Sequence, residues 1–374
     1  MKYIKQIDSL RAIAVLLVIV SHWIPNTRIT QFLPLGQIGV DIFFVISGFL
    51  ITRILLNSRI ETEETGLSMS HVVKTFYIRR ALRIFPIYYL VLFVLLALHN
   101  RIYTDISSTF VYYATYATNF YFFKVGSFDG MVSHLWSLAV EEQFYFIWPW
   151  LMLFVNRKYL LYIIIGFIVV AIGSQYAMAN RAFSELLPWN CFDAFGLGAL
   201  LSWQLTYKPE GLARLYKYLT FACILCAGLF VAGAILKQLS WILPLRTSIS
   251  VISVWTITYI IRFQNNLKFK FILNNKLLWF LGKISYGLYL YHNIIPGTLN
   301  SLLINKYLNP LLPAILYKKY WAELFLLENA ILLLLVSWVS YTFFEKKILD
   351  LKKYFDYQRK PVVAAPAVVA ELPN

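Results

Sequence analysis

The first apolar stretch of the chain, SLRAIAVLLVIVSHW, holds an arginine and a histidine eleven positions apart. Eleven helical steps of about 100° return to the same face, so Arg11 and His22 share one stripe about 16 Å apart along the axis. Histidine can act as a general base, and the arginine fork binds phosphate oxygens. There is a structural alternative for each residue. Arg11 could be a snorkelling anchor, and His22 could be a histidine bonded to a neighbouring helix.

A second block, GVDIFFVISGFLITR, places Asp41 near the helix end that we expect to lie level with His22. A carboxylate at this depth can orient and stabilise an imidazolium, as the third member of a catalytic triad does. Ser47 and Gly48 follow in mid-helix, where small residues allow helices to pack closely. Asp41 is therefore a candidate catalytic residue and Ser47 a supporting one.

The block HLWSLAVEEQFYFIWP brings His134, Trp136, Ser137, Glu141 and Glu142 to the same level. Two adjacent glutamates point about 100° apart on a helix, so we expect only one of them to face a given site. Glu141 is the candidate catalytic acid, and we expect His134, Trp136, Ser137 and Glu142 to contact the substrate or to support the site. For the other glutamate, a solvated helix start favoured by the helix dipole is the simpler interpretation.

Another block, GKISYGLYLYHN, aligns Ser285, Tyr289 and His292 on one helical face, with Tyr286 beside them. His292 falls near the same end as His22 and His134. The three histidines, Asp41 and one glutamate are thus predicted to converge. Tyr286, Tyr289 and His292 are expected to contact the substrate or to support the site.

Arginines gather at the opposite end, in FYIRRALRIFPIYY. Arg80 and Arg83 stand three positions apart and share a helical face, and Arg79 adds charge. We interpret them as a docking site for a donor that carries phosphate. The alternatives are a topology signal and a contact with lipid headgroups.

The composition requires a lipid environment, because 60% of the 374 residues are hydrophobic and only 14% are charged. The net charge of +16 does not indicate nucleic-acid binding, since the basic residues are spread between apolar runs. The three cysteines form no disulfide framework, and Cys223 and Cys226 lie in an apolar run that favours a packing role.

Ten apolar segments are long enough to be membrane helices, so we predict an all-α polytopic membrane protein. With both termini in the cytoplasm, most of the 34 Lys and Arg residues fall on the inner side. Residues 1–346 form the predicted transmembrane domain, and residues 347–374 form a predicted cytoplasmic basic tail with a disordered end. Within the domain, the aromatic run 109–123 is a candidate re-entrant or interfacial helix. The segments are 10–25, 38–56, 85–98, 141–155, 160–178, 189–205, 218–236, 245–261, 279–296 and 322–343.

Five ordered blocks resemble the membrane-bound acyltransferase family 3, the bacterial O-acyltransferases that modify cell-surface sugars. They are IDSLRAIAVLLVIVSH, GVDIFFVISGFLIT, the Arg-x-x-Arg of Arg80 and Arg83, HLWSLAVEEQFYFIWP and LGKISYGLYLYH. The resemblance implies transfer of an acyl group, usually acetyl from cytoplasmic acetyl-CoA, to a glycan hydroxyl at the outer face. Arg11 and His22 match the family's Arg and His pair, and Arg80 and Arg83 match its CoA-interacting arginines. The chain resembles the standalone form, without an appended hydrolase-like domain.

These observations lead to the hypothesis of a multi-pass enzyme of the bacterial inner membrane that acetylates a lipid-linked or surface glycan, such as a lipopolysaccharide O-antigen sugar. Acetyl-CoA would place its phosphates on Arg80, Arg83 and Arg11, and no metal is expected. His22 would act as general base or as transient acetyl carrier, with Asp41 or Glu141 setting its tautomer. The acceptor sugar, the acyl group, the carboxylate that pairs with His22 and the oligomeric state stay open.

Two other functions fit the same residues. In a proton-coupled transporter, His22, Asp41 and Glu141 would form a proton relay, and Arg11 and Arg80 would bind an anionic solute. In a metalloenzyme, His22, His134 and His292 would bind zinc, although no close pair of ligands supports this.

Overall fold

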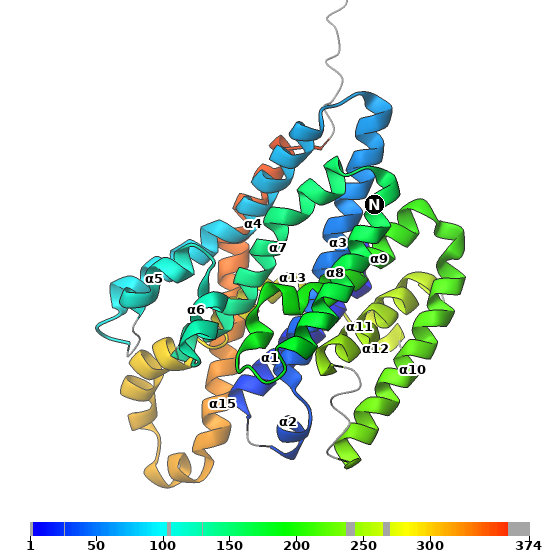
Figure 1. Ribbon diagram of the computed structural model, residues 1–374. Coiled ribbons are helices and arrows are strands. Elements are labelled where there is room, and N and C mark those ends of the chain that lie inside the picture. The colour runs from blue at the N-terminus through cyan, green and yellow to red at the C-terminus, as the bar shows by residue number, and fades with distance from the viewer. Residues whose placement is uncertain are drawn as a thin grey trace, which may run out of the picture.

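The computed structural model describes residues 3–25, 27–102, 106–128, 130–236, 244–264 and 270–357. Every regular element in these ranges is helical, which confirms the predicted helical class (Figure 1). The longer helices overlap all ten predicted segments. They are α1 (Lys5–Trp23), α3 (Leu35–Thr65), α4 (Met69–Leu98), α7 (Trp136–Phe154), α8 (Arg157–Ala177), α9 (Phe192–Tyr207), α10 (Leu212–Leu236), α11 (Leu245–Arg262), the pair α13 (Lys276–Lys283) and α14 (Ser285–Tyr291), and α15 (Ala314–Val339).

Shorter elements connect these helices. The short α-helices are α2 (Arg28–Phe32), α5 (Ile106–Ala114), α6 (Thr118–Val125), α12 (Lys270–Leu273) and α16 (Lys346–Asp350). Single 3₁₀ turns or short 3₁₀ helices occupy Gly130–Leu135, Ser184–Leu186, Pro188–Cys191, Pro209–Gly211, Asn309–Leu311 and Leu351–Tyr354. Wider π-helical turns occupy Pro296–Leu308 and Ser340–Glu345.

Six helical segments of the described residues are long and apolar enough to cross a membrane. Crossing the hydrocarbon core takes about twenty helical residues. α9 has only 16 residues, and the predicted segment 279–296 is divided between α13 and α14. The number of ten spans and the cytoplasmic position of both termini therefore stay predictions. The six segments are Lys5–Trp23, Leu35–Thr65, Met69–Leu98, Arg157–Ala177, Pro209–Leu229 and Tyr317–Tyr354.

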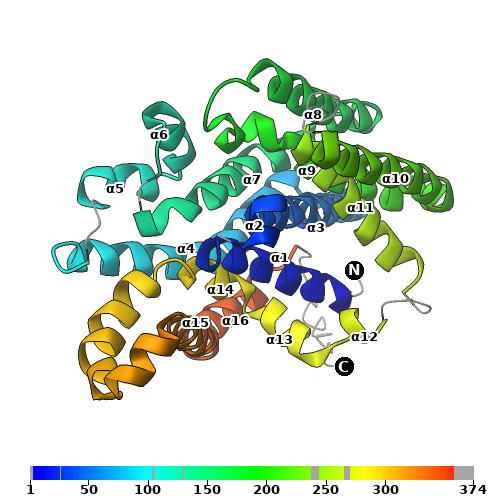
Figure 2. The same cartoon turned by 90° about the horizontal axis from the view of Figure 1, so that it is seen from below.

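Helix α3 lies at the centre of the bundle and contacts α1, α7, α9 and α11 (Figures 1 and 2). Its closest partner is α9, because glycines stand on both sides of the contact. A Cβ atom on Gly48 would overlap the backbone of Phe195, and one on Gly198 would overlap the backbone of Val45. The predicted packing role of Gly48 is confirmed.

The aromatic run 109–123 forms two short helices, α5 and α6, at the edge of the bundle, where α5 contacts α4 and α6 contacts α7 (Figure 2). They are joined through Tyr116, whose φ of 52° is left-handed. Its ring stacks on that of Tyr88 in α4, with 4.5 Å between the ring centroids. The run is therefore two helices joined by a tight turn and held by aromatic contacts.

The first part of the predicted tail is ordered. After α15 the chain continues through the π-helical turn and α16 into the 3₁₀ helix Leu351–Tyr354, which packs on α4. Arg79 Nη1 in α4 donates hydrogen bonds to the carbonyls of Lys352 at 3.1 Å and Phe355 at 2.6 Å. The stretch 358–374, which includes the segment predicted to be disordered, lies outside the described residues.

Candidate active site

Three neighbouring cavities lie along α1 and α3, and we name each by its characteristic side chains. The arginine cavity, about 540 Å³, is bordered by Tyr3, Asp8, Arg11, Arg79, Arg80, Arg83, Lys352 and Tyr357, among others. The middle cavity, about 70 Å³, is bordered by Arg11, Ser47, Arg80, Arg83, Ser137, Glu141, Ser285, Tyr286 and Tyr289, among others. The histidine cavity, about 220 Å³, is bordered by His22, Gln37, Phe128, His134, Trp136, Glu185, Arg246 and Tyr289, among others.

The cavities share their walls. Arg11, Ser47, Arg80 and Arg83 border both the arginine cavity and the middle cavity. Val40 and Tyr289 border both the middle cavity and the histidine cavity. A continuous series of side chains therefore leads from the cationic end of the bundle to His22.

The three histidines predicted to converge do so. His22 Nδ1 in α1 lies 3.1 Å from His292 Nε2, just after α14. The ring of His134, at the end of the 3₁₀ helix before α7, lies 4.7 Å from that of His292 between centroids. His134 and His292 are buried, and the exposed edge of the cluster is His22 at the histidine cavity.

Backbone carbonyls set the tautomers of these rings. His292 Nδ1 faces the carbonyl of Tyr289 at 2.6 Å and His134 Nε2 faces that of Leu290 at 3.1 Å, so each of these nitrogens carries the proton. His22 Nδ1 faces two acceptors, the carbonyl of Val18 at 3.0 Å and His292 Nε2. The proton of neutral His22 therefore sits on Nδ1, which leaves the lone pair of Nε2 available as a base.

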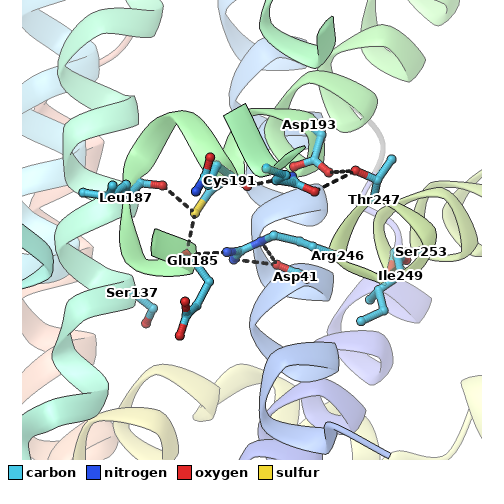
Figure 3. A network of polar contacts seen from close by, with 12 residues as sticks. Asp41, Ser137, Glu185, Leu187, Cys191, Asp193, Arg246, Thr247, Ile249 and Ser253 are labelled. Atoms are coloured by element: carbon cyan, nitrogen blue, oxygen red, sulfur yellow. Dashed lines mark hydrogen bonds and ion pairs between the residues drawn. The ribbon is translucent and has the colours of Figure 1, made fainter. Parts of the chain in front are cut away.

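Asp41 does not orient His22, contrary to the prediction. Its carboxylate is fully buried in α3 and accepts a 2.8 Å hydrogen bond from Arg246 Nε of α11, with Arg246 Nη2 at 2.7 Å (Figure 3). A buried carboxylate without a counter-ion would destabilise the folded protein by several kcal/mol. Asp41 therefore stays paired with the guanidinium and is not available to the imidazole of His22. The partner of His22 Nδ1 is His292 together with a backbone carbonyl.

The ion pair continues into a polar network that reaches α9 and the segment before it (Figure 3). Arg246 Nη1 donates to the carbonyl of Glu185 at 2.5 Å, and Thr247 Oγ1 donates to Asp193 Oδ2 at 2.7 Å. Arg246 is not among the predicted site residues, although a cation within an apolar run is a signal of a functional site. Arg246 also borders the histidine cavity, and its charge is balanced by Asp41.

Glu141 belongs to the middle cavity and does not contact His22, so this part of the prediction is also wrong. Its Oε1 accepts hydrogen bonds from Ser47 Oγ at 2.5 Å and Arg80 Nη2 at 3.1 Å, and from the Tyr145 hydroxyl. Arg80 Nε lies 3.9 Å from Glu142 Oε1, so both glutamates face the same arginine. As predicted, only Glu141 borders the middle cavity, but Glu142 is not a solvated residue, because its side chain is only 13% exposed.

The predicted supporting residues lie around these groups. Ser47 is more than a packing residue, because it binds Glu141. The hydroxyls of Ser137 and Tyr289 are hydrogen-bonded to each other, and Tyr289 also donates to the carbonyl of His134 at 3.0 Å. Trp136 borders the histidine cavity, and Tyr286 donates to the carbonyl of Ile84 at 3.1 Å. Tyr289 thus links the middle cavity to the histidine cluster.

The arginine cavity fits a phosphate-bearing group. Among the described residues, Arg83 has no carboxylate within ion-pair distance, whereas Arg11 pairs with Asp8 at 3.1 Å. Burial raises the pKa of Tyr3 to about 12, with a further contribution from Asp8, and burial raises the pKa of Tyr357 to about 12. Both phenols therefore stay protonated as hydrogen-bond donors.

The histidine cluster does not have the arrangement of a metal site. Within the described ranges, no group of three or more His, Cys, Asp or Glu side chains is placed to hold a metal ion. The reason lies in the ring orientations, because one nitrogen of each histidine faces a backbone carbonyl and His292 Nε2 faces His22 Nδ1.

Comparison with known proteins gives similarity to O-acetyltransferases. Peptidoglycan O-acetyltransferase OatA of Listeria monocytogenes is 38% identical over 185 residues, which are 44% of this chain and 27% of that protein. The "Putative peptidoglycan O-acetyltransferase YrhL" of Bacillus subtilis is 40% identical over 161 residues, 40% of this chain and 23% of that protein. The matches thus span only about a quarter of the length of these curated relatives. No solved structure matches the chain.

A family model covers far more of the chain. The model described as "Acyltransferase domain" matches residues 4–345. This range contains the residues that border the three cavities, apart from Tyr3 and the segment after α16 at the arginine cavity. Since the match extends over nearly the whole described chain, this protein belongs to acyltransferase family 3.

Proposed function

We propose that the protein transfers an acetyl group from acetyl-CoA to a hydroxyl of a bacterial surface glycan. The observation that carries the proposal is the series of three cavities, which connects a cluster of arginines to the free Nε2 of His22. Family membership and the O-acetyltransferase names of the relatives support acyl transfer.

The arginine cavity would hold the phosphates of the donor. Arg83 has no carboxylate to neutralise it among the described residues, and Arg11 and Arg80 stand beside it. Arginine binds phosphate through two parallel hydrogen bonds, which are about twice as strong as neutral ones. A thioester donor supplies an acyl carbon that is open to attack by an oxygen nucleophile.

His22 would act on the acceptor at the histidine cavity. Nε2 takes the proton of the glycan hydroxyl while the hydroxyl oxygen bonds to the acyl carbon. The carbon–sulfur bond breaks, and the sulfur leaves as a thiolate. Negative charge that develops on the acyl oxygen would be stabilised by a nearby fixed cation, and Arg246 borders the same cavity.

The proposed acceptor is a sugar of the bacterial cell surface. The resemblance suggested a lipopolysaccharide sugar, whereas the names of two relatives specify peptidoglycan. The relatives therefore favour a peptidoglycan sugar, presented at the outer face of the inner membrane. The aromatic rings of Trp136, Phe128 and Tyr289 at the histidine cavity suit the apolar face of a pyranose ring.

The test measures ester-linked acetate separately in the peptidoglycan and polysaccharide fractions of cells that carry wild-type protein, His22→Ala or no gene. We expect acetate in one fraction with the wild type and a loss of about a hundredfold to ten-thousandfold with His22→Ala. His99→Ala is the matched control, because His99 lies at the end of α4 and borders none of the three cavities. Equal acetate with wild type and His22→Ala would overturn the role of His22.

A further inference from the structure

The ordered part of the C-terminal segment forms a wall of the arginine cavity. Lys352, Asp356 and Tyr357 border it together with residues of α1, α3 and α4. Arg79 holds this segment through its bonds to the carbonyls of Lys352 and Phe355, and its guanidinium lies 5.3 Å from the Tyr357 ring centroid. The family model ends at residue 345, so no comparison assigns these residues a role.

The charge around this cavity is unbalanced. Five basic side chains border it, namely four arginines and Lys352, against the three carboxylates of Asp8, Glu61 and Asp356. Asp8 pairs with Arg11, and Arg80 pairs with the glutamates of α7. Within the part of the chain that is described, Lys352 and Arg83 have no carboxylate within 4 Å. Basic side chains at one cavity that have no carboxylate partner attract a polyanion.

We propose that Lys352 binds a phosphate of the nucleotide part of the acyl donor, and that the segment Leu351–Tyr357 is the wall of the nucleotide site. The proposal rests on acetyl-CoA being the donor. It assigns the ammonium group of Lys352 as a point-charge contact beside the arginine forks. Tyr357 adds a protonated hydroxyl and an aromatic ring to the same wall.

The neighbouring lysine is a natural control. Lys352 is half-buried and borders the cavity, whereas Lys353 is exposed and does not border it. The ammonium group of Lys353 lies instead over the Tyr354 ring, 5.0 Å from its centroid. Lys352→Ala and Lys353→Ala each remove one basic side chain from the same turn. A difference in coenzyme A affinity between the two variants would therefore report the contact of Lys352 with the ligand and not the net charge of the tail.

The experiment measures coenzyme A binding by calorimetry, with the full chain in phosphatidylcholine nanodiscs. We expect Lys352→Ala to weaken binding about tenfold, the scale of one hydrogen bond to a charged group. Lys352→Arg should retain most of the affinity, and Lys353→Ala should bind as the wild type does. Thermal unfolding of each variant verifies that the segment remains folded.

The outcomes are distinguishable. Equal binding by wild type and Lys352→Ala would overturn the lysine contact and leave the proposed function standing. Failure of the wild type to bind coenzyme A would overturn the donor assignment and this inference with it. A Lys352→Ala effect that appears only in nanodiscs with phosphatidylglycerol would assign Lys352 to a lipid headgroup and also overturn the inference.

Discussion

At the scale of single residues, the site depends on which nitrogen of each histidine is occupied. Buried imidazoles must pair their N–H groups, because an unpaired buried donor costs about 1–3 kcal/mol. Val18, Tyr289 and Leu290 supply the carbonyls that do this. His292 then presents an unprotonated Nε2 to His22, and His22 is held with its basic nitrogen toward the cavity.

His292 is therefore a positioning residue for His22, and its substitution should lower the turnover rate. We expect His292→Leu to lose about a hundredfold in acetyl transfer, the cost of a misplaced catalytic group. His292→Gln should retain more activity, because the amide oxygen can still accept a bond from His22 Nδ1–H. Initial rates and coenzyme A affinity of purified variants would check this. Equal losses with Leu and Gln, or a loss of donor binding, would contradict the positioning role.

At the scale of the elements, the position of the site depends on the contact between α3 and α9. α3 contributes Asp41 and Ser47, and α9 contributes Asp193, which binds Thr247 next to Arg246. The two helices approach closely because Gly48 and Gly198 have no side chains. This close contact brings the Asp41–Arg246 pair and the Asp193–Thr247 pair into one buried network (Figure 3).

A methyl group at this contact should destabilise the protein. Gly48→Ala would force the helices apart and cost about 1–3 kcal/mol, as overpacked cores do. Gly166→Ala in α8 is the matched control, because a Cβ atom there meets nothing within 4 Å. Thermal unfolding in detergent would measure both variants. An unchanged midpoint for Gly48→Ala, or an equal drop for Gly166→Ala, would refute the role of this contact.

At the scale of the whole molecule, the two ends of the bundle differ, because the histidine cavity lies toward one end and the arginine cavity toward the other. The turn between α1 and α3 carries α2 beside the histidine end, and the turn between α3 and α4 lies at the opposite end (Figure 1). α3, with 31 residues, spans about 46 Å between them. The positive-inside rule predicts that the arginine cavity lies toward the cytoplasm.

This orientation predicts the labelling of single cysteines in intact cells. In a variant with Cys191, Cys223 and Cys226 replaced, Thr27→Cys should react with a membrane-impermeant maleimide, and Ser68→Cys should react only after the membrane is opened. Both positions are exposed, at opposite ends of α3. The reverse pattern would place the arginine cavity outside and remove its access to cytoplasmic acetyl-CoA.

The sequence by itself determined the helical class, the family and the convergence of the three histidines. The apolar runs are long, and a polar group within such a run is costly, so each one marks a functional or structural requirement. Arg11 and His22 lie on one helix, where the period of 3.6 residues relates their positions directly. The family blocks are also local in sequence, which is why they could be recognised.

Only the tertiary structure decided which charged groups pair. Asp41 and Arg246 are separated by 205 positions, and no local pattern relates them. Helix α3 is buried on most of its surface, so its sequence has no polar stripe to indicate which neighbour Asp41 faces. The same holds for Glu141 with Arg80 and for Lys352 at the arginine cavity. Ion pairing in a low-dielectric interior depends on distances of a few ångströms, which helix packing sets and helix periodicity does not.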